Sequence, residues 1–209
     1  MRVAPPARFA RGLRIGLLGG SFNPAHEGHR QASLTALKKL GLDQVWWLVT
    51  PGNPLKNNRA LPQLAVRIAQ AGLVAHHPQI AITGIEARLG TRFTAQTLSR
   101  LTMRYPGVRF VWLMGSDNLA QFHRWQNWRG IARMMPIGVI DRPGSSHKAV
   151  RSPASIALSR WRLDESDGLL LPTETAPAWM FLHGKRSNAS STALRAARTG
   201  QQTDWPPNM

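Results

Sequence analysis

Short apolar runs alternate along the chain with segments whose apolar residues recur every three or four positions. Runs rich in β-branched and aromatic residues are typical of buried strands, whereas the longer spacing is typical of one face of a helix. The predicted strands lie at 13–18, 44–50, 80–83, 109–114, 136–141 and 179–182. Because alternating strands and helices favour parallel pairing, the pattern predicts an α/β fold with a single doubly wound, mostly parallel sheet. Ligands of such sheets bind at the carboxyl ends of the strands.

The helical pattern is clearest at 30–40, at 61–75 and from Thr94 onward. Thr94 is the expected N-cap of its helix, because a threonine hydroxyl can accept a hydrogen bond from the free backbone N–H groups there. Weaker periodicity predicts a loop at 84–93, and a loop with one short helix (155–162) at 145–175. We therefore expect one domain at 13–199, a disordered lead-in at 1–12 and a disordered tail at 200–209.

Composition narrows the classes of partner. The 209 residues contain no apolar run near the ~20 that a membrane span needs, so we expect a cytoplasmic protein without a membrane partner. The first dozen residues lack the apolar core of a secretion signal, although a transit peptide stays an alternative. The absence of cysteine excludes disulfides, thiolate metal sites and cysteine catalysis. A net charge of +17 favours anionic partners, and its even spread favours small polyanions over nucleic acid.

The densest chemistry lies between the first strand and the first helix. Gly19 and Gly20 end the strand, and glycines let the backbone turn sharply and approach a ligand closely. The helix that follows presents free N–H groups and the positive end of its dipole, which together favour phosphate. His26 and His29 are three residues apart at this helix start, so both imidazoles are expected on one side of it.

The stretch 19–29, Gly-Gly-Ser-Phe-Asn-Pro-Ala-His-Glu-Gly-His, resembles the signature of the HxGH nucleotidyltransferase superfamily. These enzymes transfer a nucleotidyl group onto a phosphate. The resemblance implies that His26 and His29 act on the triphosphate of ATP as the catalytic pair. It also implies ATP contacts from the strand end and the turn, and a substrate contact from the residue that follows: Gly19, Gly20, Ser21 and Phe22 for ATP, and Asn23 for the substrate.

Further ATP contacts are expected at three other places. Near the end of the chain, a helix start rich in hydroxyl side chains is followed one turn later by an arginine. This segment resembles the superfamily's element for the ATP phosphates, with Ala189 in place of the usual isoleucine. The resemblance implies phosphate contacts from Ser190, Ser191, Thr192 and Arg195. The fourth strand ends in Gly115 and Asp117, where a carboxylate can accept from ribose hydroxyls. Lys56, in a loop after the second strand, and Arg142, in an Arg-Pro-Gly turn after the fifth, complete the set.

Two shorter segments resemble those that bind the pyridine ring in bacterial nicotinate-nucleotide adenylyltransferases. One is Phe-Thr-Ala-Gln-Thr-Leu at 93–98, where Phe93 replaces a common tyrosine, and the other is Phe-His-Arg-Trp at 122–125. The resemblance implies that Thr94 and Trp125 bind the substrate. Trp128 is expected to pack in the core.

The family resemblance implies transfer of the adenylyl group from ATP to nicotinate mononucleotide, which gives deamido-NAD and pyrophosphate in NAD biosynthesis. Mg²⁺ is expected to enter with ATP, because the sequence offers no carboxylate cluster that would hold it. Pantetheine-phosphate and nicotinamide mononucleotide adenylyltransferases are the alternative enzymes, and a nucleic-acid-binding protein of the same fold is the alternative from another class. The sequence leaves the choice between nicotinate and nicotinamide, and the oligomeric state, open.

Overall fold

The fold is known from a computed structural model that describes residues 11–52, 61–184, 191, 194 and 195. The expected disorder of both chain ends lies largely outside these ranges. Three of the residues expected to contact ATP, namely Lys56, Ser190 and Thr192, lie outside them as well.

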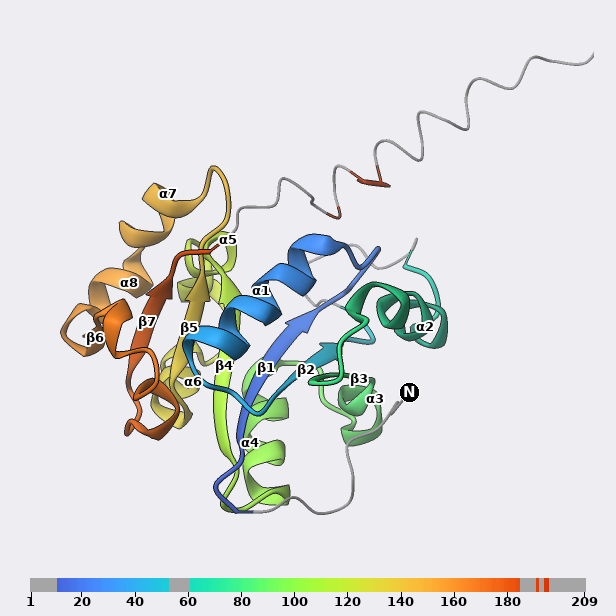
Figure 1. The fold of residues 1–209 in the computed structure, drawn as a ribbon, viewed down its shortest axis with the longest axis horizontal. Helices are drawn as coiled ribbons and strands as arrows, with labels where there is room; N and C mark the ends of the chain where they lie inside the picture. Colours follow the sequence, from blue (N-terminus) through green and yellow to red (C-terminus); the bar gives the residue numbers. More distant parts are fainter. Residues whose placement is uncertain (1–10, 53–60, 185–190, 192–193, 196–209) are drawn as a thin grey trace, which may run out of the picture.

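Within the described residues, seven parallel strands form a single sheet, which confirms the predicted fold class (Figure 1). Their spatial order is β3-β2-β1-β4-β5-β7-β6, so the chain starts in the middle and winds outward in both directions. The strands are β1 (Arg14–Gly20), β2 (Gln44–Val49), β3 (Ile80–Thr83), β4 (Arg109–Gly115), β5 (Ile137–Ile140), β6 (Arg162–Leu163) and β7 (Trp179–Leu182). The reversal of strand order lies between β1 and β4, where doubly wound sheets bind ligands.

Helices cover both faces of the sheet and enclose two apolar layers. The neighbouring residues Trp46 and Trp47 of β2 belong to different layers, because successive strand side chains point to opposite faces. The helices on the Trp47 side are α1 (Glu27–Lys39) and α2 (Leu64–Ala75). Those on the Trp46 side include α3 (Ile85–Leu89), α4 (Thr94–Arg104), α6 (Trp128–Met134), α7 (Ser146–Val150) and α8 (Pro153–Ala157). Trp128 is buried, as predicted.

The turn after β1 differs from the prediction. Neither Gly19 nor Gly20 has a positive φ, and both still belong to the strand. The backbone reverses at Phe22, whose φ of 46° is strained for a residue with a side chain. Helix α1 then begins at Glu27, three residues earlier than predicted, with His26 as its N-cap residue. Glycine is required at position 19 because the strand packs closely there, and a Cβ on Gly19 would lie 2.6 Å from the indole of Trp112.

Three further local predictions were wrong. Thr94 is not an N-cap: α4 begins at Thr94 itself, and Phe93 occupies the cap position with its carbonyl accepting from the backbone of Gln96 and Thr97. The segment 84–93 contains the short helix α3. In place of one helix at 155–162, the segment 145–175 forms α7, α8, three short 3-10 turns and the two-residue strand β6. Such short elements carry too little periodicity to be read from sequence.

A buried arginine joins the ends of the first two strands. Arg67 of α2 is only 1% exposed, and its guanidinium donates to four carbonyls. Nη1 bonds the carbonyl oxygens of Ser21 at 2.8 Å and Thr50 at 2.7 Å, Nε bonds that of Pro62 at 2.8 Å, and Nη2 bonds that of Pro51 at 3.2 Å. Burial lowers its pKa from the usual value. Arg67 therefore fixes the strand ends at which a ligand would bind.

Arg67→Met should lower the free energy of unfolding by about 3 kcal/mol or more, because each buried carbonyl left without a donor costs about 1–3 kcal/mol. Urea unfolding of the variant and of wild type measures the difference. Arg88→Met, at an exposed position of α3, is the matched control and should change little. Equal unfolding midpoints for the two variants would contradict a structural role for Arg67.

Candidate active site

The two predicted catalytic histidines lie against each other at the start of α1. Their ring centroids are 3.9 Å apart, and the backbone N–H of His26 donates to Nδ1 of His29 at 3.3 Å. A neutral His29 therefore carries its proton on Nε2. Its ring also contacts Phe22, at 4.7 Å between centroids, and Phe22 stacks on Trp47. The strained turn thus places an aromatic ring that fixes His29.

Both imidazoles are held neutral at physiological pH. Burial, followed by the nearby charge of Arg142, lowers the pKa of His26 to about 4, while Asp117 opposes the shift. Burial lowers the pKa of His29 well below its usual value, with smaller contributions from His26 and Arg142. In the part of the chain that the structure describes, Nδ1 of His26 is buried without a hydrogen-bond partner. An anion placed beside this pair would favour the charged forms and raise both pKa values.

The ends of β4 and β5 bring the next predicted group together. Nε of Arg142 lies 3.6 Å from Oδ1 of Asp117. Both side chains lie close to Gly115. A Cβ on Gly115 would lie 2.8 Å from Nε of Arg142, so any residue other than glycine there would displace the ion pair. Ser116, which the sequence analysis missed, accepts from the backbone N–H of Arg142 at 2.9 Å and contacts the hydroxyl of Ser145 at 2.5 Å. Its only sequence signal is its place directly after a strand.

The described part of the carboxyl-terminal element contacts the turn between β1 and α1. Ser191 donates from its hydroxyl to the carbonyl of Pro24 at 2.9 Å, and Nη1 of Arg195 donates to the carbonyl of Asn23 at 2.6 Å. More than 160 positions separate the partners in each pair. The structure therefore brings this predicted element to the histidine end of the site.

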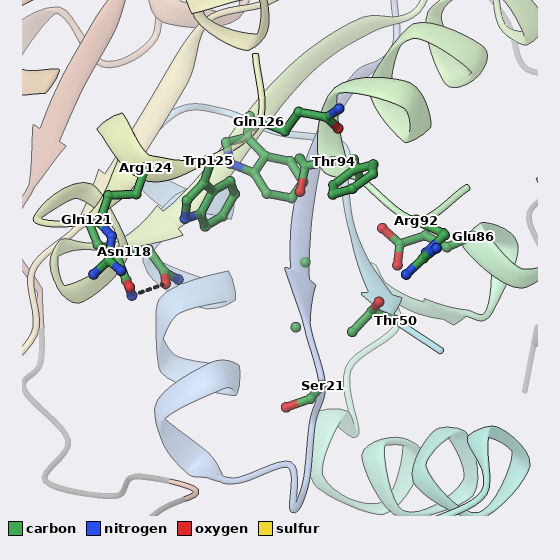
Figure 2. A pocket seen from close by; sticks show the side chains of 14 residues that line it. Ser21, Thr50, Glu86, Arg92, Thr94, Asn118, Gln121, Arg124, Trp125 and Gln126 are labelled. Atoms are coloured by element: carbon green, nitrogen blue, oxygen red, sulfur yellow. Dashed lines mark hydrogen bonds between the residues drawn. The ribbon is translucent and has the colours of Figure 1, made fainter. Parts of the chain in front are cut away.

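A pocket of about 370 Å³ lies at the end of β1, where Ser21 is among the residues that line it. Five predicted residues line it: Gly19, Gly20, Ser21, Thr94 and Trp125. Figure 2 shows Trp125 and Thr94 at one end, Ser21 at the other, and the walls between them formed by Glu86 and Thr50 on one side and Asn118 and Gln121 on the other.

Trp125 is held in place by two other aromatic side chains. Its ring packs edge to face against Phe122 at 5.5 Å and against Trp112 at 6.3 Å between centroids. Trp112 also lines the pocket. This packing leaves Trp125 available as a fixed wall on which a flat ring can stack.

The sequence analysis did not select several polar residues of the pocket. Glu86, Arg92 and Arg124 line it together with the amides of Asn118 and Gln121. Glu86 follows β3 directly in α3, at a strand end where ligand contacts are expected, and that position was its only signal. The predicted contacts at Phe22, Asn23, Gly115, Asp117 and Arg142 do not line the pocket, since they lie around the histidine pair or at the ends of β4 and β5.

Two features are absent from the described residues. No group of three or more His, Asp or Glu side chains there is arranged to hold a metal ion. No helix among them is long and apolar enough to cross a bilayer.

Comparison with known proteins identifies the class. Residues 17–197 match the family model described as cytidylyltransferase-like. A protein of Bradyrhizobium sp. (strain ORS 278) is 56% identical over 183 residues, which cover 88% of this chain and 95% of that protein. One of Rhizobium meliloti (strain 1021) is 52% identical over 188 residues, covering 90% and 100%. Both are named "probable nicotinate-nucleotide adenylyltransferase".

The solved structures agree in fold. Nicotinic acid mononucleotide adenylyltransferase of Plasmodium falciparum, complexed with NaAD, superposes with a TM-score of 0.63 at 16% identity over 88% of this chain and 83% of that one. Fold and site thus define a nucleotidyltransferase of the cytidylyltransferase-like class. Within that class, the chain belongs to the family of nicotinate-nucleotide adenylyltransferases.

Binding of inorganic triphosphate should be coupled to proton uptake by the histidine pair. The pKa values of His26 and His29 lie below neutrality in the free protein, and an adjacent anion raises them. At a pH between the free and the bound pKa values, the complex therefore holds more protons than the free protein. Affinity should therefore rise as pH falls toward about 6. Calorimetric titration at that pH, in two buffers of different ionisation enthalpy, measures the protons taken up.

The variant carrying both His26→Ala and His29→Ala is the control, because protonation of the ligand itself contributes equally to both proteins. Wild type should take up more protons than the variant, by up to about one per triphosphate. Equal proton counts would show that the imidazoles do not respond to the anion.

Proposed function

We propose that the protein transfers the adenylyl group of ATP to nicotinate mononucleotide and releases deamido-NAD and pyrophosphate. The observation that carries this proposal is that β1 leads first into the pocket, which Ser21 lines, and then into the turn that carries the histidine pair. A triphosphate on the histidines and a mononucleotide in the pocket would then meet at Ser21. The names of the relatives, and the NaAD complex of the Plasmodium enzyme, support this choice of substrates.

In the proposed reaction, an oxygen of the acceptor's 5′-phosphate attacks the α-phosphorus of ATP. A bond forms between that oxygen and the α-phosphorus, the bond from the α-phosphorus to the bridging oxygen breaks, and the β- and γ-phosphates leave as pyrophosphate. No covalent enzyme intermediate is needed. Catalysis then consists of positioning the two phosphates and stabilising the charge that develops between them.

We assign the triphosphate to the residues around the start of α1. His26 and His29 would donate to the α-phosphate and the leaving pyrophosphate, gaining protons as the anion raises their pKa values. Ser191 and Arg195, which contact the adjacent turn, would reach the β- and γ-phosphates together with Ser190, Thr192 and Lys56.

The remaining ATP contacts are assigned to the ends of the strands. Gly19, Gly20, Ser21 and Phe22 would approach ATP along β1 and the turn. Gly115, Asp117 and Arg142 at the ends of β4 and β5 would contact the adenosine ribose and a phosphate, and the open ion pair at 3.6 Å leaves both side chains with hydrogen-bonding capacity.

We assign the acceptor to the pocket. Its pyridine ring would stack on Trp125, beside the free N–H groups at the start of α4 at Thr94. Asn23, next to Ser21, would contact the acceptor where its phosphate meets ATP. Arg92 and Arg124 add positive charge to the pocket walls and suit an acceptor that carries both a carboxylate and a phosphate.

Mg²⁺ is proposed to arrive with ATP and to be held by the phosphates. The described residues offer no group of ligands for it, and no step of the reaction is assigned to it here. The cytoplasm, where ATP is abundant, is the proposed compartment.

A comparison of acceptors tests the function. With ATP present, pyrophosphate release should be fastest with nicotinate mononucleotide. It should exceed that with nicotinamide mononucleotide by roughly ten-fold to several hundred-fold in kcat/KM, since each amide N–H that faces a protein donor costs about 1–3 kcal/mol. Pantetheine 4′-phosphate, which lacks a ring to stack, should be the poorest acceptor.

Three results would contradict the proposal. A preference for pantetheine 4′-phosphate would assign the other enzyme, and equal constants for the two pyridine nucleotides would show that the pocket does not recognise the carboxylate. Binding of DNA with a steep salt dependence, unchanged in the double histidine variant and without turnover of any acceptor, would favour the nucleic-acid alternative.

His29→Ala should lower kcat by roughly 100- to 1,000-fold, or about 2.7–4 kcal/mol, and should change KM for ATP much less. The reason is that its hydrogen bond is expected to strengthen as charge develops on the α-phosphate. Steady-state kinetics measure both constants, and His77→Ala at the end of α2 is the control histidine variant. A kcat within about threefold of wild type would exclude a catalytic role for His29.

A further inference from the structure

A carboxylate without a cationic partner lies at the pocket. Glu86 is 9% exposed and lines the cavity, and in the described part of the chain no arginine, lysine or histidine lies within ion-pair distance of it. Its Oε1 accepts from the hydroxyl of Thr97 at 3.3 Å, and that hydroxyl lies 2.8 Å from the hydroxyl of Thr91. Burial raises the pKa of Glu86, while the hydroxyls of Thr50 and Thr97 oppose the shift. A buried carboxylate bound only by hydroxyls retains capacity to accept further hydrogen bonds.

The geometry of the pocket indicates which part of an acceptor would reach Glu86. The ring end is set by Trp125 and Thr94, and the phosphate end by Ser21, where the strand runs on toward the histidines (Figure 2). Gly19 and Gly20 of β1 also line the pocket, and Glu86 and Thr50 lie along one wall between the two ends (Figure 2). In a mononucleotide, the group between the ring and the phosphate is the ribose. Its 2′- and 3′-hydroxyls are donors that a carboxylate binds well.

We propose that Glu86 binds the ribose hydroxyls of the acceptor nucleotide, and that it thereby restricts the acceptor to ribonucleotides. This inference rests on the proposed function, since it places an acceptor mononucleotide in this pocket. Thr97 and Thr50 act as positioning residues that orient the carboxylate. An acceptor without a ribose, such as pantetheine 4′-phosphate, would leave the buried carboxylate without these donors, which is unfavourable.

The test compares nicotinate mononucleotide with its 2′-deoxy and 3′-deoxy analogues. Wild type should lose about ten-fold in kcat/KM with at least one deoxy analogue, as expected for loss of a hydrogen bond to a charged group. Glu86→Gln should lose about ten-fold with nicotinate mononucleotide, through KM for the acceptor, while KM for ATP stays within about twofold. With the sensitive deoxy analogue, the same variant should differ from wild type by less than about threefold, because the partner hydroxyl is already absent.

Two controls separate binding from a structural role. Thr97→Val removes the hydroxyl that bonds Oε1 of Glu86 but keeps the carboxylate. In this variant, replacing nicotinate mononucleotide by the sensitive deoxy analogue should therefore still lower kcat/KM. Glu174→Gln, at an exposed position, should match wild type with all three acceptors. An equal loss in Glu86→Gln for the native and both deoxy acceptors would show that Glu86 only joins α3 to α4, and would overturn the inference.

A wild-type measurement keeps the inference testable if Glu86→Gln fails to fold. Wild type that turns over nicotinate mononucleotide and both deoxy analogues equally well would contradict the role of Glu86 and leave the proposed function intact. Wild type that turns over no pyridine mononucleotide would instead contradict the proposed function.

Discussion

The site depends on one buried guanidinium. Among the described residues, Arg67 bonds no carboxylate and donates to four backbone carbonyls, two of which belong to Ser21 and Thr50 at the ends of adjacent strands. The last backbone bond between these strands joins the N–H of Thr50 to the carbonyl of Gly20 at 3.0 Å, and Arg67 ties the carbonyls beyond it. Arg67 therefore holds Ser21, which lines the pocket and begins the turn toward the histidines, against the end of β2. Loss of this tie would affect both halves of the site at once.

The two halves differ in how they handle charge. At the histidines, burial and the positive charge of Arg142 keep the imidazoles neutral, so this region has a deficit of anions that a triphosphate would supply. In the pocket, the buried carboxylate of Glu86 has no cation within ion-pair distance in the described part of the chain, so it can still accept hydrogen bonds from a ligand. Each half therefore lacks the kind of group that one of the two proposed substrates would bring, namely anionic phosphates at the histidines and hydrogen-bond donors at Glu86.

Much of the site could be predicted from sequence, because its residues follow strands with strong apolar patterns. The histidine pair lies at the start of a helix after the first strand, as the pattern predicted, whereas the strand-end glycines and Thr94 do not form the turn and the cap expected of them. What could not be predicted depends on contacts across the fold. The reversal at Phe22 requires its ring to stack on Trp47, and Glu86 becomes significant only because α3 turns it toward the end of β1. The elements of 145–175 are two to five residues long and carry no period that a sequence could reveal.

The contacts of Ser191 and Arg195 with Pro24 and Asn23 have a consequence during synthesis. The histidine turn leaves the ribosome more than 160 residues before its partners do. A nascent chain can build the sheet and the acceptor pocket before it can close the phosphate end. Under the proposed assignment, the triphosphate site is therefore complete only after Ser191 and Arg195 have been made and have reached the turn.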